Sequence, residues 1–473
     1  MYTNRRKFLT HTSALTASAL TGALGNWGIR SAEAQGVTGY KALVGIFMFG
    51  GADSNNKIVP NDAARFTQYS TVRAPAVGLT QAQLLPFTTT TQAAGNNSYG
   101  FHPSFAPIVP LYTAKKLAVI ANAGTLIAPI TMAQYKAGVS RPPNLFSHSD
   151  QQALWQGLLP GQVIRSGWGG RFADKLMIVN SGAAIPTMVS VSGTQVFNQG
   201  LATTPFVIPS AGGVLLSGQA ADAVSMARFN ALRALLGTGG SNQIVNAAAS
   251  TLDGALDAAT AANPFLTGTI PTVITNAFVN PANPAQQLNS GIANQLKQVA
   301  RLIEGRAALG IKRQVYLVNI GGWDTHSNVL TNEKNLLDQL VPAMKAFYDY
   351  TVAAGLANDV TQFTMSDFNR TFVTNQSLGT DHAWGGHHFV LGGSVKGGDM
   401  YGTFPTLMLG NQKAPLPSGP DDTGSNGAWL PTTAVDQIAS TLALWFGASA
   451  SDLTYIFPNL KNFAGKENLG FMG

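Results

Sequence analysis

Short runs of consecutive apolar residues, each of strand length, alternate along this chain with patterns of helical periodicity. Runs that are apolar on both faces favour buried strands of a parallel sheet. The runs cover residues 40–49, 117–122, 315–320, 363–365 and 388–391, and the clearest helical patterns cover 333–354 and 432–446. The alternation predicts an α/β fold with a doubly wound, mostly parallel sheet and helices on both faces. In such a fold, ligands bind outside the carboxyl ends of the strands.

The chain has 473 residues, of which 45% are hydrophobic, so it can bury a large core. We expect residues 35–473 to form a single α/β domain. Residues from about 200 to 310 are rich in Ala, Thr, Asn and Gly and contain helical patterns. We interpret this stretch as a mainly helical insertion whose alanine-rich face is used for packing.

The first 34 residues are typical of an export signal. Arg5, Arg6 and Lys7 precede Phe8 and Leu9, and a nearly uncharged run leads to a small-x-small pattern that ends at Ala34. The paired arginines resemble a twin-arginine signal, although a plain secretory signal is the alternative. We therefore expect recognition by the twin-arginine translocation machinery and a periplasmic or secreted protein. The apolar run is too short to span a bilayer, so we expect no transmembrane segment after signal removal.

Charge and cysteine content exclude several classes of protein. Residues 1–34 hold four of the 29 basic residues and one of the 22 acidic residues, so the remaining chain has a net charge of +4 instead of +7. Because no cluster of basic and aromatic residues remains, we expect no nucleic-acid partner. The absence of cysteine excludes disulfides, thiolate nucleophiles and Cys-ligated metals.

Carboxylates and histidines gather where predicted strands begin or end. GGADSNN (50–56) follows the first run, GGWDTH (321–326) follows the third, and GTDHAWGGHH (379–388) leads into the last. Carboxylate and imidazole groups are ligands for divalent ions, here zinc, calcium or manganese, and two such ions can clamp a phosphoryl group. The alternative is that these residues cap turns and satisfy buried backbone groups. The candidate ligands are Asp53, Asp324, His326, Asp381 and His382.

Together with the signal and GGADSNN, several further motifs resemble a bacterial exported family known as domain of unknown function 1501. They are HPSFAPIVPLY (102–112), NLFSHSDQQALWQ (144–156), GGWDTH, SDFNRT (366–371), GTDHAWGGHHFVLGG (379–393) and IFPNLKNF (456–463). That family in turn is similar to the alkaline phosphatase and sulfatase superfamily. The resemblance implies an alkaline phosphatase-like fold.

The superfamily resemblance also implies site residues. A carboxylate after the first strand matches Asp53, and a later carboxylate and histidine match Asp324 and His326. The next Asp-His pair matches Asp367, but Phe368 stands in place of the histidine. Asp381 and His382, with His387 or His388, can compensate or form a different site, so either one ion or two is expected.

A nucleophile at the start of a helix is the remaining feature that the superfamily implies. Ser147, followed by His148, precedes a helical pattern and is the candidate nucleophile, with Ser54 as the alternative. Either serine could instead be a helix cap or a turn residue. Asn55 and Arg370 are candidates for contacting an anionic group.

These features predict an exported, metal-dependent hydrolase or transferase of phosphate or sulfate esters. The chain lacks the C/S-x-P-S-R motif of typical sulfatases, and it has no G-x-S-x-G, Rossmann or P-loop motif. The alternative is a non-catalytic envelope protein of the same fold, with a structural metal, that binds a cell-envelope polymer instead of an anionic ester substrate.

Overall fold

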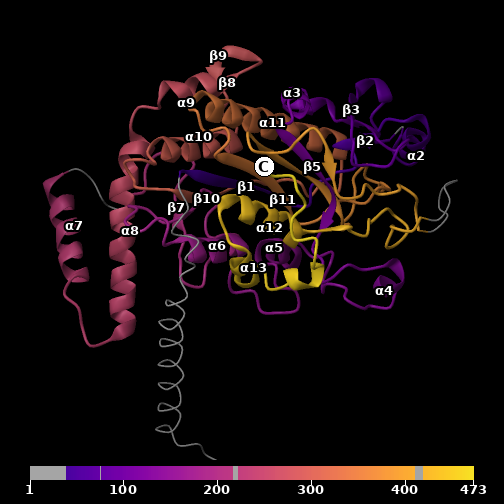
Figure 1. The fold of residues 1–473 in the computed structure, drawn as a ribbon. Coiled ribbons are helices and arrows are strands. Elements are labelled where there is room, and N and C mark those ends of the chain that lie inside the picture. Colours follow the sequence, from indigo (N-terminus) through magenta and orange to yellow (C-terminus); the bar gives the residue numbers. More distant parts are fainter. Residues whose placement is uncertain (1–38, 75, 217–221, 411–418) are drawn as a thin grey trace, which may run out of the picture.

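A mixed, mostly parallel sheet forms the centre of the computed structural model, which describes residues 39–74, 76–216, 222–410 and 419–473. The expected signal, residues 1–34, lies outside the described residues. Among the described residues, nine strands form the sheet in the order β13-β5-β12-β11-β1-β10-β6-β7, with β14 paired to β5 (Figure 1). The strands are β1 (Lys41–Met48), β5 (Leu117–Gly124), β6 (Met188–Ser190), β7 (Phe206–Val207), β10 (Arg313–Ile320), β11 (Val360–Ser366), β12 (Gly386–Gly392), β13 (Met400–Tyr401) and β14 (Thr433–Ala434).

Strand direction in this sheet decides which loops meet. β1 pairs in parallel with both β10 and β11, and β10 pairs in parallel with β6. β12 runs antiparallel to β11 and to β5. The five apolar runs in the sequence correspond to β1, β5, β10, β11 and β12, so the prediction of an α/β fold with a mostly parallel sheet is confirmed.

Helices cover both faces of the sheet (Figure 1). Because side chains alternate along a strand, Val44 and Ile46 of β1 pack in one core cluster while Leu43 and Phe47 pack in the other. The first cluster includes α10 (Gly291–Glu304) and α11 (Val329–Ala353), and the second includes α5 (His148–Gly157), α6 (Trp168–Leu176), α12 (Val435–Phe446) and α13 (Ala450–Ile456).

Smaller elements surround this core. β2, β4 and β3 form a three-stranded sheet, and β8 and β9 form a hairpin. These strands are β2 (Ile58–Pro60), β3 (Leu85–Thr88), β4 (Ser98–Phe101), β8 (Val279–Asn280) and β9 (Asn283–Gln287). The other helices are α2 (Ala63–Arg73), α3 (Val109–Thr113), α4 (Met132–Lys136), α7 (Ala223–Leu236), α8 (Gln243–Thr267) and α9 (Thr272–Ala277).

The stretch at about 200–310 divides into two parts. α10 packs against α11 and β10, with Ile292, Leu296, Val299 and Ile303 buried at helical spacing. α7 and the adjoining end of α8 instead project from the body (Figure 1), and no residue of α7, as the structure describes it, is buried. In the described part of the chain, no helix has both the length and the apolar character needed to cross a membrane.

Substitutions in the sheet and in the projecting helical hairpin, formed by α7 and the adjoining end of α8, should affect stability differently. Leu317 of β10 is fully buried, whereas Leu235 of α7 is 68% exposed. We expect Leu317→Ala to lower the free energy of unfolding by about 2–5 kcal/mol through lost burial and a cavity. Leu235→Ala should change it by less than about 0.5 kcal/mol. Urea unfolding measures both values, and equal losses would contradict the fold described.

Candidate functional site

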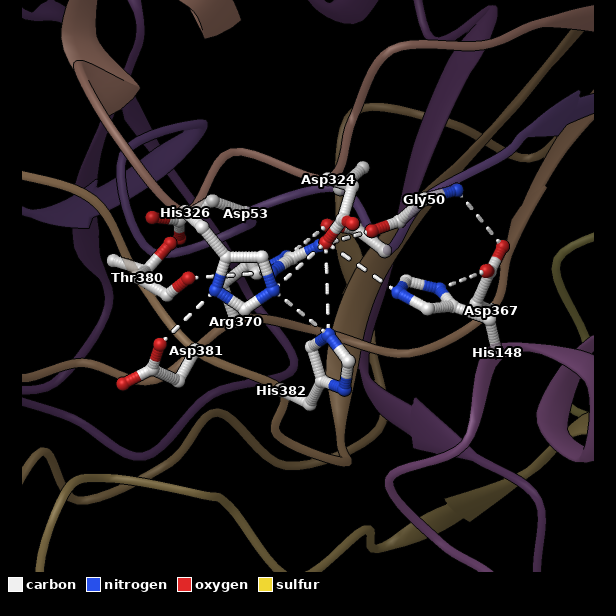
Figure 2. Close-up of polar contacts among 12 residues, drawn as sticks. Gly50, Asp53, His148, Asp324, His326, Asp367, Arg370, Thr380, Asp381 and His382 are labelled. Atoms are coloured by element: carbon white, nitrogen blue, oxygen red, sulfur yellow. Dashed lines mark hydrogen bonds and ion pairs between the residues drawn. The ribbon is translucent and has the colours of Figure 1, made fainter.

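Four loops and one helix converge at the carboxyl edge of β1, β10 and β11 (Figure 2). Asp324 follows β10 and Asp367 follows β11, and parallel strands end at the same edge of a sheet. Since β12 runs the other way, the loop that precedes it reaches this edge with Asp381 and His382. His148 enters as the first residue of α5.

Two glycines allow these loops to approach one another closely. Gly50 has a φ of 119°, and a Cβ there would lie 2.4 Å from the backbone nitrogen of Asp324. Gly51 has a φ of 79°, and a Cβ there would lie 2.4 Å from the ring of Phe368. Both the conformation and the space therefore require glycine after β1.

Three imidazoles face one oxygen of Asp324. The distance from Asp324 Oδ1 to Nε2 is 3.4 Å for His148, 3.0 Å for His326 and 3.6 Å for His382. The Nε2 atoms of His326 and His382 are 3.0 Å apart. The ring of Phe368 packs 4.9 Å from the ring of His148 and 4.6 Å from that of His382, between centroids, and forms an apolar wall.

The second nitrogen of each ring contacts a hydrogen-bond acceptor. His148 Nδ1 lies 2.7 Å from Asp367 Oδ2, and His326 Nδ1 lies 3.1 Å from Asp381 Oδ1. His382 Nδ1 lies 2.7 Å from the carbonyl oxygen of Phe146. With Nδ1–H donating in each case, every Nε2 presents a lone pair toward Asp324.

Asp367 holds His148 from a buried position. Its carboxylate also accepts hydrogen bonds from Gln152 Nε2 at 2.7 Å and from the backbone N–H of Gly50 at 3.1 Å. The side chain of Asp367 is fully buried, whereas that of His148 is 30% exposed. Asp367 therefore orients the imidazole that lies nearer the surface.

Arg370 contributes a fixed positive charge beside Asp324. Its Nη2 contacts Asp324 Oδ1 and the carbonyl of Gly50, and its Nε donates to the carbonyl of Gly51 at 2.8 Å. Nη1 donates to Thr380 O at 3.2 Å and lies 3.3 Å from His326 Nε2. These contacts use the donors of the guanidinium group, which is fully buried.

The charges at this edge affect the pKa values of two site residues. Partial burial raises the pKa of Asp324, but the hydrogen bond and charge of Arg370 outweigh it, so the pKa is below its usual range. Burial lowers the pKa of His382, and the charge of Arg370 adds to this effect. An ionised Asp324 and a neutral His382 are the forms that bind a metal ion.

Asp53 lies in a buried ion pair instead of at Asp324. Its Oδ2 is 2.8 Å from Arg73 Nη1, and both side chains are fully buried. Its Oδ1 accepts from the backbone N–H and side-chain Nδ2 of Asn55, at 2.9 and 3.0 Å. Asn55 also donates to the carbonyl of Arg370 at 2.9 Å, so these two residues support the loop that carries Arg370.

Three other candidates from the sequence are engaged elsewhere. Ser147 is the N-cap of α5, and its hydroxyl donates to Asp150 Oδ2 at 2.6 Å. Ser54 is buried and donates to Asn369 Oδ1 at 2.9 Å. His387 is buried on β12, where its Nδ1 accepts from the N–H of Asn122 at 3.1 Å and its ring stacks on Phe404.

Sequence reasoning missed Arg73 and the carbonyl of Phe146. Arg73 is one of two arginines in α2, and no motif connects it with Asp53. The backbone oxygen of Phe146 has no sequence signal, although its neighbours Ser147 and His148 were both candidates.

The arrangement can hold a metal ion. Ligand atoms of His148, Asp324 and His382 all lie within 4.8 Å of one another. The Nε2 of His148 is buried and has no hydrogen-bond partner among the residues that the structure describes. A buried nitrogen without a hydrogen-bond partner, aimed at a carboxylate and a second imidazole, fits a ligand to a cation.

The chain belongs to the family described as "Protein of unknown function (DUF1501)", which matches residues 40–418. A comparison with curated proteins finds no match. Among solved structures, the chain is similar to the C-terminal periplasmic domain of EcEptC from Escherichia coli in complex with Zn, with 9% identity, coverage of 75% of this chain and 73% of that chain, and a TM-score of 0.27. It is also similar to Ps i-CgsB in complex with k-i-k-neocarrahexaose, with 9% identity, coverage of 91% and 78%, and a TM-score of 0.32. At such TM-scores neither structure bears on activity, and the alkaline phosphatase-like fold stays a prediction.

Metal binding should stabilise the protein through His148 and His382. We expect Zn²⁺ at 100 times its Kd to add about 2.7 kcal/mol to the free energy of unfolding and to raise Tm. His148→Ala and His382→Ala should each abolish this rise. The control is His102→Gln, because His102 caps the Pro103–Phe105 turn through Nδ1 and should leave the rise intact. An equal rise in all three variants would place the ion elsewhere.

Acid should destabilise the protein through His387 and His388. Burial lowers the pKa of each to about 3. Below the unfolded-state pKa of about 6.5, the unfolded chain binds protons that the folded chain excludes. The free energy of unfolding should therefore fall by about 1.4 kcal/mol per pH unit for each histidine as pH drops from 6.5 towards 3. His387→Asn should reduce that slope by about 1.4 kcal/mol per pH unit, which is the contribution of one proton. Urea unfolding at several pH values measures the slope, and an unchanged slope would contradict this prediction.

Proposed function

We propose that this member of the DUF1501 family is a metal-dependent hydrolase or transferase of phosphate or sulfate esters. The observation that carries the proposal is the paired use of both nitrogens in three histidines. Each Nε2 faces Asp324 Oδ1, and each Nδ1 contacts Asp367, Asp381 or the Phe146 carbonyl. Metal-binding histidines almost always donate their other ring N–H to such acceptors.

His148, Asp324 and His382 are the residues that we assign to the ion. Two imidazoles and one carboxylate suit zinc, and three protein ligands leave a position for water or substrate. Imidazole also makes zinc a better fit than calcium, while manganese remains compatible with this donor set. When bound, such an ion polarises an ester oxygen and stabilises the negative charge that develops on it.

His326 is the residue that we assign to proton transfer. Asp381 accepts from its Nδ1–H, which leaves Nε2 with a lone pair directed into the site. The side chains of His326 and Asp381 are 46% and 54% exposed, so protons can exchange with solvent. In this proposal the oxygen of the attacking water or acceptor hydroxyl bonds to the phosphorus or sulfur atom as the ester P–O or S–O bond breaks. His326 accepts the proton of the attacking group and gives it to the departing oxygen, while the fixed charge of Arg370 balances Asp324.

The attacking group in this proposal is water, for hydrolysis, or the hydroxyl of an acceptor, for transfer. Ser147 is less suitable, because its hydroxyl already donates to Asp150 and caps α5. Ser54 is only 1% exposed and is bound to Asn369. An anionic ester would bind at an ion held by His148, Asp324 and His382, since Arg370 already donates to backbone carbonyls.

The exposed apolar side chains of the helical hairpin formed by α7 and α8 favour a second candidate function. Val224, Leu235, Ile244 and Val245 of α7 and α8 are between 59% and 81% exposed. Exposed apolar groups of this kind suit an envelope protein that binds a polymer or another protein and uses the metal for structure only. Loss of stability on chelation, without turnover under any condition, would support this second function.

Export completes the proposal. The paired arginines at positions 5 and 6 support delivery by the twin-arginine machinery to the periplasm or the medium. That route carries folded proteins and so suits a protein that acquires its metal before export.

Turnover should depend on His326 and not on Ser147. With zinc-loaded protein and a panel of phosphate monoesters, phosphate diesters and sulfate esters, we expect His326→Ala to lower kcat about 10²- to 10⁴-fold. The metal-dependent rise in Tm should remain in this variant. Ser147→Ala, the matched control, should lose about 1 kcal/mol of stability and little activity.

Two results would contradict the proposal. The absence of turnover on the whole panel with stoichiometric metal would reject the enzymatic function. If Ser147→Ala lost turnover and His326→Ala did not, Ser147 would be the nucleophile. That result would also reject the proton-transfer role of His326.

A further inference from the structure

Arg370 lies where the ligands for a second metal ion would otherwise meet. In two-metal sites the ions lie about 4 Å apart and clamp the attacking and leaving oxygens of a phosphoryl transfer. Here Asp324 Oδ1 faces His148 and His382 and also contacts Arg370 Nη2. Arg370 Nη1 lies 3.3 Å from His326 Nε2 (Figure 2). The guanidinium therefore contacts both Asp324 and His326, the two groups that a second ion beside the first would use.

We infer that the centre binds a single divalent ion and that the guanidinium of Arg370 occupies the place of a second. The inference rests on the proposed metal site and specifies its stoichiometry. The positive charge of Arg370 balances Asp324 and repels a second dication at short range. The guanidinium of Arg370 thus supplies the positive charge that a second ion would otherwise bring.

The surroundings of Arg370 keep it in this place. The side chain is fully buried and donates to the carbonyls of Gly50, Gly51 and Thr380. Asn55 holds the backbone carbonyl of Arg370 at 2.9 Å. If the guanidinium moved away to admit an ion, the buried carbonyls of Gly51 and Thr380 and the partly buried carbonyl of Gly50 would lose their donor.

A second arginine removes another carboxylate that an ion could use. Asp53 follows β1 at the same edge of the sheet, but Arg73 binds its Oδ2 and Asn55 binds its Oδ1. Arg73 is itself fixed by hydrogen bonds to the carbonyls of Thr371 and Phe372, at 2.9 and 3.1 Å. Arg73 and Arg370 therefore each neutralise one strand-end carboxylate.

Metal stoichiometry tests this inference. The purified chain is saturated with Zn²⁺, freed of excess and measured by elemental analysis and native mass spectrometry, and Mn²⁺ loading is followed by electron paramagnetic resonance. We expect one ion per chain and an uncoupled manganese signal. Arg370→Gln removes the charge and should raise the stoichiometry from one to two, with spin coupling between two manganese ions. Arg370→Lys keeps the charge and should stay at one.

Several outcomes would overturn the inference. Two ions in the unaltered chain would reject it, as would a single ion in an Arg370→Gln protein whose circular dichroism matches that of the unaltered chain. If Arg370→Gln does not fold, Arg370→Ser replaces it and the same criterion applies. Two ions with ester turnover would reject only this inference, whereas no bound ion would also reject the proposed function.

Discussion

The parallel pairing of β1 with β10 and β11 is the constraint on which the rest of the site depends. Parallel strands place their carboxyl ends together, so Asp53, Asp324 and Asp367 all follow strands at one edge. Three carboxylates so close together repel one another unless each has a compensating partner. The structure supplies Arg73 for Asp53, Arg370 for Asp324, and His148 with Gln152 for Asp367.

The compensating partners differ in burial, and this difference separates the roles of the carboxylates. Asp53 and Arg73 are both fully buried, so breaking the pair would leave an isolated charge in the core. Their hydrogen bonds reach Asn55, Thr371 and Phe372 and thereby support both sides of the Arg370 loop. Asp324 is 48% exposed and faces three imidazoles, which leaves it available to a ligand. The buried pair positions the loop, and the exposed carboxylate faces the site.

The strand runs, the helices on both faces and the gathering of Asp324, His326 and His382 could be predicted from the sequence, because apolar periodicity and strand-end chemistry are local signals. His148 was expected only beside the candidate nucleophile Ser147, at the start of a helix. The partner of Asp53 could not be predicted in this way. Arg73 is 20 residues away on α2, and only the packing of that helix brings it to the loop after β1.

The position of His387 could not be predicted from a local pattern either. Alternate residues of β12 face opposite sides of the sheet, so His388 faces Trp155 while His387 stacks on Phe404.

Two carboxylate-histidine pairs at this edge have the same chemistry but different surroundings. His148 and Asp367 have side chains that are 30% and 0% exposed, and Phe368 packs on the ring, so this imidazole is held in one orientation with little access to water. His326 and Asp381 are 46% and 54% exposed, so a proton can reach and leave this pair. A ligand needs a fixed lone pair, whereas proton transfer needs exchange with solvent. This difference in burial supports the proposed assignment of His148 to the ion and of His326 to proton transfer.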